Sequence, residues 1–185
     1  MTPLWQLELA TEAVCVMPAG HPLQALETVS VADLIDVDLV LLVRQRSLRQ
    51  QIDQAFRLGR VMPQIRAEVH SVEMACRFAA QGLGVSIVNG LFAHLCRDMG
   101  IVCRPLRPRI AYRLGVAMLA GQSPDPLVPE MATRLLDAMA RRAGPDAFTV
   151  ERRPAPPDAA EAGASGMPAG LSGQEAGPLP GHGPA

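Results

Sequence analysis

Two short polar stretches of this 185-residue chain combine residue types that bind anions, and each follows an apolar run. The first is Arg44-Gln-Arg-Ser47, which follows residues 38–43; the second is His70-Ser-Val72, which follows residues 65–69. Guanidinium groups bind carboxylates through paired hydrogen bonds. Backbone amides at a helix N-terminus also attract anions. The pattern predicts a site for a small acid built from Arg46, Ser47, His70, Ser71 and Val72.

Each stretch also has a purely structural interpretation. Ser71 can simply cap the helix that follows it, because its hydroxyl accepts a bond from a backbone amide that would otherwise lack a partner. The arginine-rich turn can be a solvated surface loop. Asn89, at the end of the next apolar run, can contact a ligand or cap a helix. Since such strand ends share one crevice in a parallel sheet, the functional hypothesis joins all three places.

The elements that must position these residues follow from the apolar periodicity. Residues 65–69, 72–81 and 85–88 read as strand, helix and buried strand, with Gly82 and Gly84 ending the helix. Such a βαβ unit should be right-handed. A second helix is predicted over 48–58, with Ser47 as its N-cap. Further strands are predicted at 13–17, 38–43, 101–106 and 110–119, and further helices at 31–35, 90–97 and 130–142.

Composition limits the classes of function. The net charge of −1 offers no basic field for nucleic acid. No signal peptide and no membrane-spanning run is recognised, so a cytoplasmic protein without membrane contact is expected. The four cysteines lack metal-binding spacing and are expected to be reduced. No cofactor loop, metal site or catalytic pattern occurs, so nothing argues for an enzyme.

The composition changes near Ala143, where Ala, Gly, Pro, Ser, Asp and Glu become dominant. Such a segment cannot bury enough apolar surface to offset the entropy lost on ordering. A disordered tail is therefore predicted over residues 143–185.

Five motifs occur in the order that is typical of LysR-type transcriptional regulators, and the chain resembles that family from Leu7 to Arg141. The motifs are Val14-Cys-Val-Met-Pro-Ala-Gly-His-Pro-Leu23, Ser30-Val-Ala-Asp-Leu34, Ile52-Asp-Gln-Ala-Phe56 with Gly59 and Pro63, Glu68-Val-His-Ser71, and Phe78-Ala-Ala-Gln-Gly-Leu-Gly-Val85. Residues 84–90 and 102–106 are also similar to the branch that senses basic amino acids and opines.

The resemblance implies an α/β, periplasmic-binding-protein-like (type 2) effector domain of two lobes. Residues 1–22 would end the first lobe and form the first crossing strand. Residues 23–100 would form a complete second lobe. Residues 101–142 would return to the first lobe, which is partial in this sequence.

The resemblance also implies a non-catalytic function, in which a small carboxylated, amino acid-like effector binds between the lobes. Arg46, Ser47, His70, Ser71 and Asn89 occupy the corresponding positions. A winged helix-turn-helix and a dimerisation helix should precede this region, and neither is recognised in the sequence. DNA contact is therefore expected only through that absent domain, in a homo-oligomer. The alternative is a solute-binding protein of the same fold that serves a transporter; the lack of an export signal counts against it.

Overall fold

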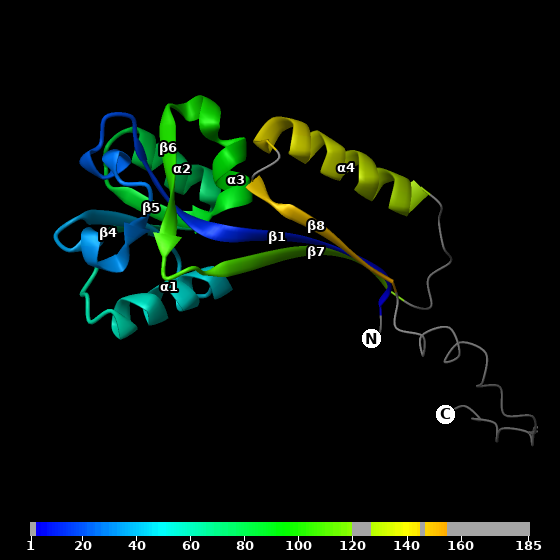
Figure 1. Cartoon of the computed structure of the whole chain (residues 1–185), viewed down its shortest axis with the longest axis horizontal. Coiled ribbons are helices and arrows are strands. Elements are labelled where there is room, and N and C mark those ends of the chain that lie inside the picture. The colour runs from blue at the N-terminus through cyan, green and yellow to red at the C-terminus, as the bar shows by residue number, and fades with distance from the viewer. Residues whose placement is uncertain (1–2, 120–126, 145–146, 155–185) are drawn as a thin grey trace, which may run out of the picture.

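The computed structural model describes residues 3–119, 127–144 and 147–154, which form one curled eight-stranded sheet with helices on both faces (Figure 1). The strands are β1 (Pro3–Pro18), β2 (Val29–Ser30), β3 (Asp38–Leu42), β4 (Gln64–Val69), β5 (Val85–Asn89), β6 (Ile101–Arg107), β7 (Ala111–Leu119) and β8 (Thr149–Pro154). The α-helices are α1 (Ser47–Leu58), α2 (Val72–Ala80), α3 (Gly90–Leu95) and α4 (Leu127–Ala143). Short 3-10 turns cover Pro22–Ala25, Val31–Leu34 and Arg97–Met99.

The long strand β1 connects the two parts of the sheet. The main strand order is β2-β6-β1-β5-β3-β4, and β7 and β8 also pair with β1. The C-terminal half of β1 lies antiparallel to β5 and β6, whereas its N-terminal half lies antiparallel to β7 and β8. Figure 1 shows β1, β7 and β8 extending as a ribbon from the larger part of the sheet, with α4 alongside.

Alternation along β1 explains how one strand serves two cores. Ala13, Cys15 and Met17 pack in the cluster that includes the buried face of α1. The side chains of Val14 and Val16 point to the opposite face and pack with α2 and α3. This two-residue period is that of a strand covered on both faces. Leu9 joins a third cluster under α4.

The predicted strands and helices occur in the predicted order, with differences at their ends. The cap of α1 is one residue earlier than predicted: Arg46 occupies the N-cap position without a side-chain cap bond, and Ser47 is the first helical residue. The reason is that Arg46 has extended backbone angles (φ −78°, ψ 131°), whereas a serine cap would need them at Ser47.

Ordered structure continues beyond Ala143, where the sequence predicted the start of a disordered tail. Ala147 and Phe148 are buried against Leu9 and Leu136, and β8 then pairs with β1. A composition window missed this segment because the few apolar residues are followed by a long Ala, Gly and Pro-rich stretch. The remaining part of the predicted tail, residues 155–185, lies outside the described residues.

Candidate functional site

The carboxyl ends of three parallel strands lie at one edge of the sheet, and a helix begins beyond each of them. Strand β3 pairs in parallel with both β4 and β5. The strands lead into α1, α2 and α3, respectively. All six residues that the sequence predicted as a site lie at these three junctions. In open α/β sheets this edge is the usual place for a ligand.

One hydrogen bond brings the first two junctions together. The guanidinium Nη2 of Arg46 donates to the backbone oxygen of His70 at 3.2 Å. Arg46, Ser47 and His70 are all exposed. No side-chain acceptor caps α1, so its first amides and its dipole face the same space as Arg46. The junctions before α1 and α2 therefore form one electropositive surface.

Ser71 meets the geometry of a helix cap. Its Oγ accepts a hydrogen bond from the backbone amide of Met74 at 3.2 Å. The structural interpretation of Ser71 thus applies, although its exposed hydroxyl keeps a proton that it can donate. Val72 begins α2 and packs partly against the core on that face of the sheet.

Asn89 also caps a helix. Its Oδ1 accepts a hydrogen bond from the backbone amide of Phe92 at 3.0 Å, and the residue is only 4% exposed. Asn89 pairs with Ala13 in the register between β5 and β1, next to the point where β1 leaves the larger part of the sheet. Asn89 therefore differs from Arg46 and Ser71, because its side chain is buried and its Oδ1 is used to cap α3.

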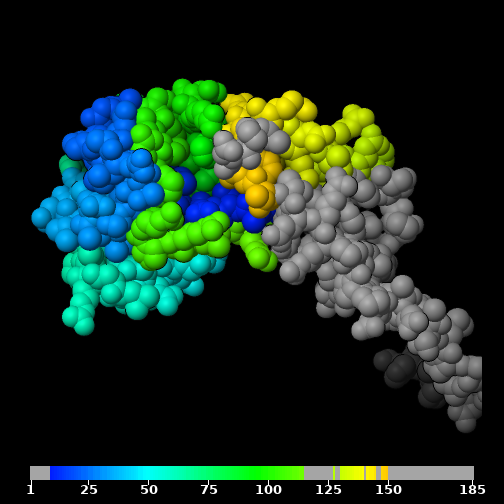
Figure 2. Space-filling model, viewed as in Figure 1, coloured from blue at the N-terminus to red at the C-terminus, as the bar shows by residue number. Residues whose placement is uncertain are grey.

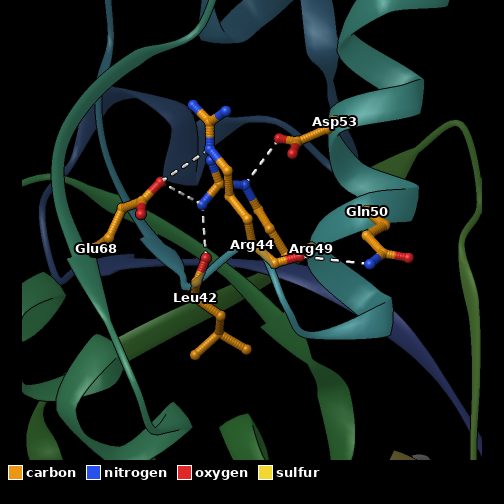
Figure 3. A network of polar contacts seen from close by, with 6 residues as sticks. All are labelled: Leu42, Arg44, Arg49, Gln50, Asp53 and Glu68. Carbon is orange, nitrogen blue, oxygen red and sulfur yellow. Dashed lines mark hydrogen bonds and ion pairs between the residues drawn. The ribbon is translucent and has the colours of Figure 1, made fainter.

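One charged residue at this edge, Arg49 in the first turn of α1, was not predicted from the sequence. It is 1% exposed and contacts Leu42, Asp53 and Glu68 (Figure 3). The available signal was the spacing of Arg49 and Asp53, four residues apart on one helix. That spacing normally marks an exposed pair, which is why burial could not be inferred from it.

A separate hollow of about 620 Å³ lies beside β1, where the strand passes from one part of the sheet to the other. Figure 2 shows this face, with blue atoms of β1 set back behind the green atoms of β7. None of the six predicted residues lines it, although Gly90 next to Asn89 does. Its charged lining includes Glu12 and Arg109, which form an ion pair. This hollow is thus distinct from the junctions at α1 and α2.

The four cysteines are free thiols, of which Cys15 and Cys76 are buried, as predicted, whereas Cys96 and Cys103 are partly exposed. Burial is the main cause that raises the pKa of Cys15 to about 12 and the pKa of Cys103 to about 11. These thiols therefore stay protonated at neutral pH and are poor nucleophiles and metal ligands. In the described part of the chain, no group of His, Cys, Asp and Glu side chains is arranged to hold a metal ion. Every helix described is too short or too polar to cross a bilayer.

The curled α/β sheet, with candidate binding residues at the ends of its parallel strands, has the architecture of a periplasmic-binding-protein-like domain. The profile described as the LysR substrate binding domain matches residues 5–140. The chain therefore belongs to the LysR substrate-binding domain family and is an effector-binding regulatory domain of that family. The family and fold class predicted from the sequence are confirmed.

Two curated relatives are regulators by name. Regulatory protein NocR of Agrobacterium tumefaciens (strain T37) is 32% identical over 127 residues, which are 69% of this chain and 42% of NocR. Transcriptional activator protein LysR of Escherichia coli (strain K12) is 34% identical over 96 residues, which are 52% of this chain and 31% of that protein. This chain thus spans less than half the length of these relatives. Their class does not favour the solute-binding alternative.

A solved structure shows the same fold. The regulatory domain of CcmR from Synechocystis PCC6803, in complex with 2-PG, superposes with a TM-score of 0.55 at 18% identity. The match covers 72% of this chain and 67% of the CcmR chain. At this identity the likeness shows the fold and leaves the ligand of the present domain open.

Proposed function

We propose that this domain senses a small carboxylated metabolite, which binds at the junctions before α1 and α2 and thereby controls DNA-dependent transcription. The carboxylate would accept hydrogen bonds from Arg46 and from the uncapped amides of α1. The adjoining wall of the site would consist of Ser47, His70, Ser71 and Val72. Asn89 would complete the site at the end of β5. The binding of 2-PG to the CcmR domain supports small-molecule sensing by this fold.

The observation that carries the proposal is the state of Arg46. Its guanidinium reaches a neutral backbone oxygen, at His70, and among the described residues no carboxylate pairs with it. An exposed guanidinium presents five donors in a rigid fork, and one carbonyl occupies only part of that fork. The remaining donors suit a carboxylate, and the adjacent helix dipole favours the same charge.

The mechanism is a shift between conformations rather than catalysis. A ligand changes the population of a state only through its different affinity for the two states. A carboxylate held at the two junctions would shift an equilibrium of closure between the two lobes. We propose that the domain reports this closure to a DNA-binding part of the regulator outside this chain, in a cytoplasmic homo-oligomer. The lobes would comprise residues 1–22 with 101–142, and residues 23–100.

The ligand class is amino acid-like, and the basic amino acids and opines are the first candidates. This choice rests on the motif at residues 84–90 and on the similarity to NocR and LysR. Thermal melts of the purified chain against arginine, lysine, ornithine, an opine and unrelated acids test it. A ligand at a hundredfold excess over its dissociation constant stabilises the folded state by about 2.7 kcal/mol.

Two pairs of variants locate the site. Arg46→Gln should abolish the ligand-induced rise in Tm, whereas Arg57→Gln, at an exposed arginine of the last turn of α1, should retain it. Ser71→Ala should weaken binding, whereas Ser30→Ala should not. Ser30 is the matched control because its Oγ caps the 3-10 turn of Val31–Leu34. It accepts a hydrogen bond from the backbone amide of Asp33 at 3.3 Å. A full ligand shift in both Arg46→Gln and Ser71→Ala would exclude these junctions as the site.

A further inference from the structure

Arg49 is a charged side chain in the interior, directly behind the proposed site. Its Nη1 donates to the backbone oxygen of Leu42 at 2.6 Å and forms an ion pair with Oε1 of Glu68 at 2.9 Å. Its Nε donates to Oδ1 of Asp53 at 2.8 Å. Figure 3 shows these acceptors around the guanidinium, one from the end of β3, one from β4 and one from α1 itself.

Burial of this charge needs an explanation beyond stability. Moving an ion out of water is costly, and a buried ion pair often stabilises a fold no more than well-packed apolar residues would. A leucine or methionine at position 49 would extend the apolar face that Leu48 and Ile52 already provide. What an apolar residue lacks is a rigid fork of donors that fixes three groups relative to one another.

Two of the three groups lie at the bases of the two site junctions, and the third, Asp53, lies on α1 itself. Leu42 ends β3, four residues before Arg46. Glu68 lies in β4, two residues before His70. The loop of residues 43–46 is therefore held at its base by Arg49 and at its mouth by the bond from Arg46 to His70. The backbone amide of Val43 also donates to the oxygen of Val69 at 3.0 Å, so the strands stay paired without Arg49. Loss of the Arg49 contact would instead loosen the loop beyond Val43 and the bond from Arg46 to His70.

Arg49 also keeps the mouth positive. Glu68 lies 3.7 Å from the Nε of Arg44, whose side chain is 74% exposed. Arg49 lies closer to the same carboxylate oxygen and is shielded from water, so Glu68 interacts more strongly with Arg49 than with Arg44, although Arg49 also pairs with Asp53. Arg46, which has no carboxylate partner among the described residues, keeps its charge for a ligand. Without Arg49, Glu68 would pair more closely with Arg44, beside the proposed ligand.

We propose that Arg49 is a positioning residue, which joins the junctions before α1 and α2 into one preformed anion-binding unit without touching the ligand. Its role in affinity rests on the proposed function; its role in holding the junctions together does not. A preformed site strengthens binding because the side chains and loops lose less conformational entropy when the ligand binds.

The direct test is amide hydrogen exchange of the ligand-free chain, with Arg49→Lys as the variant. Lysine keeps the charge but presents one compact ammonium group in place of the fork. Exchange should rise in the peptides that cover residues 43–48 and 69–74, and it should stay unchanged in those of β1 and β6. Arg77→Lys is the matched control, because Arg77 pairs with Glu73 four residues away in α2 but is 64% exposed.

The second readout is affinity for L-arginine as the probe, measured by calorimetry. Arg49→Lys should raise the dissociation constant by about tenfold, and Arg77→Lys should leave it within about twofold, the tenfold change corresponding to about 1.4 kcal/mol. Glu68→Gln, which leaves the bonds from Arg49 to Leu42 and Asp53 in place, should raise exchange in the same peptides by a smaller amount. This variant keeps the test informative should Arg49→Lys fold poorly.

The outcomes separate the two proposals. Unchanged exchange at both junctions in Arg49→Lys and in Glu68→Gln would overturn the positioning role, whatever the probe does. Raised exchange with unchanged affinity would overturn its importance for binding. If no carboxylated probe binds the wild-type chain, the proposed function fails, and the exchange comparison still decides whether Arg49 holds the junctions together.

Discussion

Phe148 offers the sharpest test of the ordered segment that follows α4. It is 9% exposed and packs in the cluster that contains Leu9, Leu91 and Leu136. The preceding residue is held by the hydroxyl of Thr11, which donates to the backbone oxygen of Ala147 at 2.9 Å in a buried setting. If this packing is correct, Phe148→Ala must leave a cavity under α4.

The magnitude follows from the loss of buried surface and the cavity that remains. Truncation of a buried phenylalanine to alanine costs about 3–5 kcal/mol of stability. Because Phe148 keeps a small exposed fraction, the expected cost for Phe148→Ala is about 3 kcal/mol. For an ordered region of this size, that loss lowers Tm by roughly 6–12 °C. The matched control is Leu58→Ala on α1, where the side chain is 75% exposed. It should cost under about 0.5 kcal/mol.

Urea unfolding, followed by far-UV circular dichroism, provides the measurement. The unfolding midpoint should shift to lower urea in Phe148→Ala. A cost as small as that of Leu58→Ala would refute the packing of this segment against β1 and α4.

Two further predictions concern close packing and titration. Gly84→Ala places a Cβ 2.5 Å from the backbone oxygen of Asp38 and should destabilise the fold by about 2–3 kcal/mol. Gly82→Ala has open space for its Cβ but keeps a positive φ of 74°, so it should destabilise the fold by about 1–2 kcal/mol. A lower urea midpoint for Gly82→Ala than for Gly84→Ala would contradict this reasoning. Because burial raises the pKa of Cys15 to about 12 and of Cys103 to about 11, above the ordinary value of 9.0, these thiols ionise first in the unfolded chain. The contribution of these thiols to the free energy of unfolding is fully present below pH 9. It falls as pH rises above 9, by about 1 kcal/mol for each thiol at pH 10. Equal pH dependence in a variant with both cysteines changed to alanine would exclude this cause.

Much of the fold was accessible from local sequence pattern. The apolar run of Ala13 to Met17, the apolar face of residues 72–79 and the glycines that end α2 depend on neighbours within a few residues, so local pattern alone predicts them. The motif order then predicted the family, which the match over residues 5–140 confirmed. The positions of the site junctions followed too, because parallel strands bring their carboxyl ends to one edge.

Only the tertiary structure decided which polar groups meet. The bond from Arg46 to His70 joins residues 24 positions apart, and the burial of Arg49 depends on β4 lying beside β3. Likewise, Phe148 is buried because β8 pairs with β1, at the other end of the chain. The sequence by itself determined the elements and their order, since these arise from local contacts. Contacts between distant segments depend on how the chain closes in space, and those contacts set the charge, depth and geometry of the site.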